Sequence, residues 1–222
     1  PFVRDGLARM GEGLSALQTL PHEQAISIKV PSCASRWLLR RLQAFEGEAV
    51  EVRGSHSHGI DFSREPFDLA IVYQPCLGRY PHSQPLFQER LTPVCAPAFA
   101  AKHRLFERDL NELLLLPLIH ASADRRDWRN WFAAFLDIPW QPQGGQLFDT
   151  LDLAMNAALQ GFGLSLGDPT IVAEELESGA LVAPFAPVLE TDHEYALIAR
   201  PDSQRQGVAR TYHWLLESRD QP

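Results

Sequence analysis

The sequence has few cysteines, no long apolar run and no excess of basic residues. Its three cysteines, Cys33, Cys76 and Cys95, form an odd set without CxxC spacing, which disfavours a disulfide scaffold and favours a reducing, cytoplasmic compartment. No apolar stretch approaches the roughly 20 residues that cross a bilayer, and the first residues contain no signal-peptide core. The net charge of −8 argues against a nucleic-acid-binding module within this chain.

Motifs that carry catalysis are also lacking. There is no Gly-rich phosphate loop, no G-x-S-x-G and no H-E-x-x-H. No histidine or acid lies close to Cys33 in the sequence, so a structural or ligand-contact role is favoured over a nucleophile. No third ligand follows His56 and His58 at a metal-site spacing, which favours a solvated loop over a metal site. The sequence therefore predicts neither an enzyme nor a cofactor or metal centre.

What is present is enough apolar material for a core. The 222 residues are 45% hydrophobic and suit one large domain or two small ones. Strands and helices alternate, which is typical of an α/β fold with a mostly parallel, helix-covered sheet, and the apolar strand 68–73 predicts helices on both of its faces. The predicted strands are 26–30, 49–53, 68–73, 86–95, 117–121, 146–148, 163–166 and 193–199. The predicted helices are 2–20, 36–45, 98–103, 107–116, 127–136, 151–160, 169–177 and 203–218.

Two rounds of strand–helix units predict two lobes. The rounds join near 92–98, and the chain returns near 190–193, which predicts a double crossover between the lobes and a hinged clamshell. Ligands of open α/β sheets bind beyond the carboxyl ends of the strands. In helix 127–136, the spacing of Trp128 and Trp131 predicts core positions rather than a ligand cage.

Two polar corners lie at the starts of predicted helices. The first, at 31–35, follows a buried strand, and the second, at 148–152, precedes an Ala-rich helix. The first backbone N–H groups of a helix have no partner within it and favour an anion. We expect the two corners to face each other across a cleft that holds a small ligand.

The cap of the second helix is open to two interpretations. If Asp149 caps it, Asp152 completes an acidic capping box and the corner favours a ligand with an amino or neutral polar group. If Thr150 caps it, the helix end stays open to an external carboxylate.

Several segments between Ile26 and about Glu217 form an ordered set. They are SCASRWLLRRLQAF, IDFSREPFDLAIVY, ERLTPVCAPAFA, RDWRNWF, FDTLDLAMNAALQGFGLSL, GALVAPF and HEYALIARP, followed by a final helix with WLLE. Together these segments resemble the effector-binding domain of LysR-type transcriptional regulators, most closely the branch that contains the glycine-cleavage and β-lactamase regulators.

The resemblance implies two Rossmann-like α/β lobes joined by a double-crossover hinge, similar to type 2 periplasmic binding proteins. Lobe one would be 26–96 plus 191–222, and lobe two 97–190. Residues 1–20 would end a linker helix from an N-terminal winged helix-turn-helix that is absent from this chain. The implied effector-binding residues are Ser32, Cys33, Ser55, Tyr73, Ser122, Thr150 and Tyr195. Tyr73 stands where several relatives place arginine. Because a tyrosine hydroxyl cannot neutralise a carboxylate as a guanidinium does, the resemblance does not imply that the effector is an acid.

The implied partners are a small-molecule effector, which is an amino acid, a small carboxylate or a cell-wall peptide, and a second copy of this domain. The full-length protein would be a homotetramer that contacts DNA only through the missing domain, with no membrane partner.

Two other functions compete with this interpretation. A solute-binding protein of a transporter has the same clamshell, and a lyase of the arogenate or prephenate dehydratase kind would need an acid–base group, for which only His193 or Tyr195 is a candidate.

Overall fold

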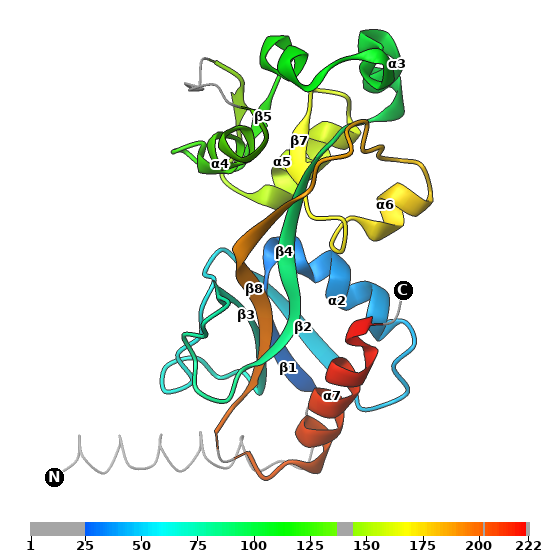
Figure 1. The fold of residues 1–222 in the computed structure, drawn as a ribbon. Helices are drawn as coiled ribbons and strands as arrows, with labels where there is room; N and C mark the ends of the chain where they lie inside the picture. Colours follow the sequence, from blue (N-terminus) through cyan, green and yellow to red (C-terminus); the bar gives the residue numbers. More distant parts are fainter. Residues whose placement is uncertain (1–24, 137–143, 202, 221–222) are drawn as a thin grey trace, which may run out of the picture.

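The computed structural model describes residues 25–136, 144–201 and 203–220. Figure 1 shows two lobes connected by the long strands β4 (Gln84–Val94) and β8 (Leu189–Ala199). The main sheet has the strand order β2 (Val50–Ser55), β1 (Ile26–Pro31), β3 (Leu69–Pro75), β8, β4 and β7 (Ser165–Gly167), so it continues from the lower lobe, lobe one, into the upper lobe, lobe two. The two-lobed α/β fold predicted from the sequence is confirmed. The helix and linker predicted within residues 1–20 lie outside the described residues.

Lobe one contains three parallel strands and two helices. The strands are β1 (Ile26–Pro31), β2 (Val50–Ser55) and β3 (Leu69–Pro75). The helices are α2 (Ser35–Leu42) and α7 (Gln206–Glu217). Ile28 and Leu69 pack in one buried cluster with Leu38 of α2 and Leu215 of α7. Burial of each such side chain stabilises the fold by roughly 1.5 to 3 kcal/mol.

Loops rather than helices cover the second face of the β3 region. Val72 and Ile198 form a separate buried cluster against Phe62, Phe67 and Tyr80, which lie between the strands in the sequence. The prediction of helices on both faces of this strand is therefore wrong. The apolar run alone could not distinguish a helix from a loop as the covering layer, because aromatic loop residues exclude water equally well.

The lobes are joined by β4 and β8, which have 11 residues each and pair antiparallel. β8 also pairs antiparallel with β3, and β4 with the short strand β7 (Ser165–Gly167). The predicted double crossover is confirmed. The predicted mostly parallel sheet is wrong, because strands that cross directly between lobes in opposite directions pair without a crossover helix.

Lobe two is built around a cluster of aromatic side chains. Trp128 and Trp131 are fully buried, as predicted, and pack with Phe132. The helices of lobe two are α3 (Pro97–His103), α4 (Arg126–Phe135), α5 (Leu151–Leu159) and α6 (Ala173–Glu177). Its remaining strands are β5 (Ile119–His120) and β6 (Gln146–Leu147).

Two predicted helices of lobe two are shorter or different in type. Residues 107–116 do not form an α-helix: two 3₁₀ turns, η2 (Leu105–Glu107) and η3 (Leu110–Leu115), take their place. The chain is extended at Arg108, and Asp109 then begins η3 with a capping box to Glu112. Of the predicted helix 169–177, only α6 is α-helical. No helix in the described ranges has the length and apolar character needed to cross a membrane.

Arg36 of α2 binds three side chains of lobe two. Its guanidinium donates to Asp152 Oδ1 and Asn156 Oδ1, both at 3.0 Å, and to Glu175. The Arg36 and Glu175 side chains are only 24% and 16% exposed. We name these four residues the Arg36 cluster. It ties α2 of lobe one to α5 and α6 of lobe two through charge-assisted hydrogen bonds, which are the stronger class.

A buried lysine holds a loop of lobe one. Lys29 of β1 is 4% exposed, and its Nζ donates to the carbonyl oxygen of Gly59 at 2.8 Å and to Glu65 Oε2 at 2.5 Å. Arg200 donates to the carbonyl oxygens of Phe62 and Phe67 in the same loop. These bonds fix the loop that follows β2.

We expect Lys29→Met to lower the free energy of unfolding at pH 7 by about 2 kcal/mol, since it leaves Glu65 and the Gly59 carbonyl without their charged donor. The hydrogen bond from Lys29 lowers the pKa of Glu65, so its contribution is present above the ordinary glutamate pKa and is lost as the pH falls through the lowered value. Urea unfolding at pH 7 and pH 3 measures this, and the loss is expected to be smaller at pH 3.

The other lysine of the sequence, Lys102, is exposed and provides the matched control. Lys102→Met is expected to change stability by less than about 0.5 kcal/mol. Equal losses for Lys29→Met and Lys102→Met would contradict the structural role of Lys29.

Candidate functional site

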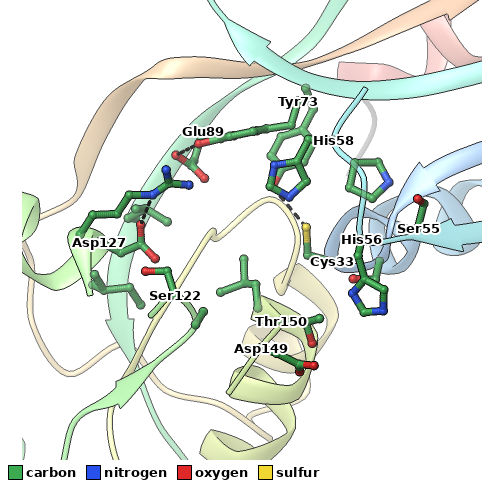
Figure 2. A pocket seen from close by; sticks show the side chains of 18 residues that line it. Cys33, Ser55, His56, His58, Tyr73, Glu89, Ser122, Asp127, Asp149 and Thr150 are labelled. Carbon is green, nitrogen blue, oxygen red and sulfur yellow. Dashed lines mark hydrogen bonds and ion pairs between the residues drawn. The ribbon is translucent and has the colours of Figure 1, made fainter. Parts of the chain in front are cut away.

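A cavity of about 340 Å³ lies between the lobes. Side chains from both lobes line it, and Figure 2 shows them converging on one space. All seven residues singled out from the sequence are among them: Ser32, Cys33, Ser55, Tyr73, Ser122, Thr150 and Tyr195. The other lining residues are Pro31, His56, His58, Glu89, Leu91, Ala121, Arg126, Asp127, Asp149, Leu151 and Leu166. The expected convergence of the two polar corners is therefore confirmed.

The corner of lobe one is a single 3₁₀ turn, η1 (Ser32–Ala34), between β1 and α2. No side chain caps η1 or α2. Cys33 Sγ lies 3.4 Å from the hydroxyl of Tyr195. Burial raises the pKa of the Cys33 thiol, which keeps it protonated at neutral pH and makes it a poor nucleophile. The structure therefore favours a ligand-contact role for Cys33 over a role as a covalent nucleophile.

The corner of lobe two is the N-terminus of α5. Thr150 is its N-cap residue, and its Oγ1 accepts a hydrogen bond from the backbone N–H of Leu153 at 3.2 Å. The cap is therefore Thr150 rather than Asp149, which decides the question that the sequence left open. The first N–H groups of a helix have no partner within it. Since η1 contacts α5, the two corners meet across the cavity.

A buried carboxylate forms part of the cavity wall. Glu89 of β4 is 9% exposed, and its Oε2 accepts hydrogen bonds from the hydroxyls of Tyr73 and Thr191, both at 2.8 Å. Burial raises its pKa despite these two donors. Glu89 was missed by the sequence analysis, because strand β4 has an irregular register between Gln88 and Arg90. Such an irregularity changes which side chains face inward, and alternation along the strand does not reveal it.

A second carboxylate enters the cavity from the first turn of α4. Arg125 has a left-handed backbone (φ 51°), which ends the preceding turn and starts the helix at Arg126. Arg126 Nε lies 3.7 Å from Asp127 Oδ1, and burial raises the pKa of Asp127. Figure 2 shows Asp127 and Glu89 on the same side of the cavity. In the sequence, only the spacing of the tryptophans in this helix carries a signal, and nothing marks Arg126 or Asp127 as lining a cavity.

Aromatic rings form the wall on the side of lobe one. The ring of Tyr73 stacks on His193 with centroids 4.9 Å apart and meets His58 edge-on at 5.3 Å. Tyr195 stacks on Phe87 at 4.8 Å. His58 is exposed, as expected for a solvated loop, and also lines the cavity, which the sequence analysis did not predict. No cluster of three or more His, Cys, Asp or Glu side chains suited to a metal ion occurs in the described part of the chain.

Residues 21–220 match the protein family described as the LysR substrate binding domain. The chain is 33% identical over 188 residues to the HTH-type transcriptional regulator PerR of Escherichia coli K12, covering 82% of this chain and 61% of that protein. It is 26% identical over 221 residues to the glycine cleavage system transcriptional activator of Escherichia coli K12, covering 96% of this chain and 71% of that protein. The chain thus spans less than two thirds of the length of PerR.

Solved structures show the same fold. The effector domain of the transcriptional regulator AmpR of Pseudomonas aeruginosa superposes with a TM-score of 0.71 at 25% identity, covering 88% of this chain and 95% of that chain. The AmpR effector binding domain of Citrobacter freundii gives a TM-score of 0.70 at 20% identity, covering 88% and 98%. Because the family match extends over residues 21–220 and the fold agrees with it, this chain belongs to the LysR substrate binding domain family.

Proposed function

We propose that the interlobe cavity binds a small-molecule effector and that the whole protein uses this binding to regulate transcription. The observation that carries the proposal is that the helix-start corners of both lobes, η1 and the N-terminus of α5, line one cavity. The curated relatives, PerR and the glycine cleavage activator, are transcriptional regulators. This favours a regulator over the solute-binding protein and the lyase.

The effector acts in this proposal by shifting a conformational population. We assign 26–96 plus 191–222 to lobe one and 97–190 to lobe two, with β4 and β8 as the moving connection. A ligand that touches both lobes binds one lobe arrangement better than another, and it shifts the equilibrium by that difference in affinity. The seven residues from Ser32 to Tyr195 that were singled out from the sequence would be its contacts.

The proposal also includes a second copy of this domain, DNA and a class of effector as partners. Two copies of this domain would pair antiparallel, with a helix of lobe one against lobe two of the partner, and the full-length protein would be a cytoplasmic homotetramer. DNA would be bound by a separate winged helix-turn-helix domain, since this chain carries a net charge of −8. The effector would be an amino acid, a small carboxylate or a cell-wall peptide, and the chain would have no enzymatic activity.

A thermal-shift screen of these three compound classes tests the proposal, because a ligand of the folded state raises its melting temperature. For a compound that binds, we expect Thr150→Val to weaken the affinity by up to about tenfold, since a lost hydrogen bond costs about 0.5 to 1.5 kcal/mol. Thr150→Val also removes the cap hydroxyl and lowers stability by about 1 kcal/mol. Calorimetry measures the affinity.

Thr150→Ser is the matched control, because it keeps both the cap and the hydroxyl and is expected to retain the affinity. Ser32→Ala is expected to weaken binding without affecting the α5 cap. Unchanged affinity in both Thr150→Val and Ser32→Ala would defeat the assignment of the effector site.

A further inference from the structure

Acidic side chains outnumber basic ones among the charged residues that line the interlobe cavity. Among the described lining residues, three carboxylates, Glu89, Asp127 and Asp149, stand against one guanidinium, that of Arg126. Carboxylates only accept hydrogen bonds when ionised. A ligand that fills this cavity therefore meets more acceptors than donors on this set of side chains.

Glu89 has unused accepting capacity inside the protein. Both of its recorded donors, the hydroxyls of Tyr73 and Thr191, bind the same oxygen, Oε2. Within the described residues, Oε1 has no hydrogen-bond partner, although the residue is 9% exposed and lines the cavity. An ionised carboxylate in such a place is stabilised by a cation that brings its own hydrogen-bond donors.

Asp127, whose side chain is 34% exposed, also lacks a hydrogen-bond donor among the described residues. Its nearest cation is Arg126, whose Nε lies 3.7 Å from Oδ1. That distance exceeds the range of a hydrogen bond. The described part of the chain offers its carboxylate no other donor, and the Arg126 side chain is 53% exposed, so it is weakly held. Burial raises the pKa of both Glu89 and Asp127, as expected for carboxylates that lack full compensation.

The side of the cavity formed by the N-terminus of α5 favours an anionic group. Thr150 caps α5 with its own hydroxyl, which leaves the leading N–H groups of this nine-residue helix available to an external acceptor. Asp152, the acid of the first turn, is already bound to Arg36. Figure 2 places Thr150 on the side of the cavity away from Glu89 and Asp127. A carboxylate is the group that such a helix end favours.

We propose that the effector is a zwitterion of the amino-acid type, with its ammonium group between Glu89 and Asp127 and its carboxylate at the N-terminus of α5. This inference rests on the proposed function of the cavity. The volume of about 340 Å³ lies at the low end of small-molecule sites, which span about 300 to 1,000 Å³. It therefore suits a single amino acid or a short peptide.

Matched sets of compounds test this assignment on the whole chain. Each set contains an amino acid, the acid that lacks its amino group and the amine that lacks its carboxyl group, for example alanine, propionate and ethylamine. The sets cover the L- and D-forms of the common amino acids. We expect thermal shifts from one or more amino acids and none from the matching acids or amines, because each of these leaves one side of the cavity unsatisfied.

Calorimetry on variants then locates the ammonium group. Glu89→Gln and Asp127→Asn keep the size of the side chain and remove its charge, and each is expected to weaken amino-acid binding between about tenfold and about a hundredfold. The control is Glu217→Gln on the exposed face of α7, outside the cavity, which is expected to leave the affinity unchanged.

The outcomes separate the two proposals. If an acid without an amino group binds as tightly as its amino acid, or if neither Glu89→Gln nor Asp127→Asn weakens binding, the zwitterion assignment is overturned. If Thr150→Val still weakens the binding of that compound, the cavity remains the effector site and only the zwitterion assignment fails. If no compound of any class shifts the melting temperature, both the assignment and the proposed function are contradicted.

Discussion

Replacing Arg36 by methionine is expected to lower the free energy of unfolding by about 2 to 3 kcal/mol, because it leaves the largely buried Glu175 carboxylate without its cation. The value lies below the full cost of breaking a buried ion pair, since Asp152 is 33% exposed and water screens it. The loss of these bonds also removes the side-chain hydrogen bonds from α2 to α5 and leaves the exposed Arg40–Glu177 pair between α2 and α6. Chemical unfolding measures the first effect.

The second effect of Arg36→Met is on the arrangement of the lobes. Without the Arg36 cluster, a smaller fraction of molecules has both corners in place around the cavity. The apparent affinity for the effector falls in proportion to that fraction. Small-angle X-ray scattering is expected to show a broader distribution of lobe separations in the variant than in the wild type.

Arg40→Met is the matched control, one turn further along α2. Arg40 pairs at 2.8 Å with Glu177, whose side chain is 58% exposed. Exposed ion pairs contribute less than about 1 kcal/mol. If Arg40→Met costs as much stability as Arg36→Met and both bind effector like the wild type, the Arg36 cluster does not hold the lobes together.

Trp128→Ala is expected to have the largest effect on stability, a loss of about 3 to 5 kcal/mol. The indole is 1% exposed, stacks on Phe132 at 5.3 Å and donates from Nε1 to the carbonyl oxygen of Ile119 at 2.9 Å. The substitution opens a cavity in the core of lobe two and leaves the Ile119 carbonyl without its donor. Urea unfolding measures the loss.

The substitution also reaches the site, because Trp128 directly follows Asp127 in α4. Loss of the indole releases the first turn of this helix, and we expect effector binding to weaken as well. Trp128→Phe is the control: it keeps most of the apolar volume, loses the hydrogen bond from Nε1 and is expected to cost about 1 to 2 kcal/mol. A loss below about 1 kcal/mol for Trp128→Ala would show that α4 is not held by this side chain.

The sequence predicts the parts of the site that depend on local patterns. Apolar alternation before residue 31 and helical spacing after residue 35 predict the strand–turn–helix unit around Ser32 and Cys33, and the polar corner at Thr150 follows in the same way. The resemblance to LysR-type regulators then placed the remaining predicted residues, from Ser55 to Tyr195, around the same cavity. Such strands and helices can be predicted from one sequence because their hydrophobic periodicity depends on residues that are close together in the chain.

The missed residues depend on long-range geometry. Glu89 faces the cavity from a strand with an irregular register, and its hydroxyl partner Thr191 is 102 positions away in the sequence. The direction of Asp127 depends on how Trp128 fits the core of lobe two. The mixed sheet was missed for the same reason, since the pairing of β4 with β8 joins segments separated by most of lobe two. Such contacts are fixed by tertiary packing, which a single sequence does not display.

In the proposed function, one ligand touches both lobes at once. A crystal structure of this chain with the compound that gives the largest thermal shift would reveal such a contact. We expect ligand density between the lobes, within hydrogen-bond distance of the Ser32–Cys33 turn and of the N-terminus of α5 around Thr150. Density that contacts only one lobe, or that lies outside this cavity, would contradict the proposed contact with both lobes.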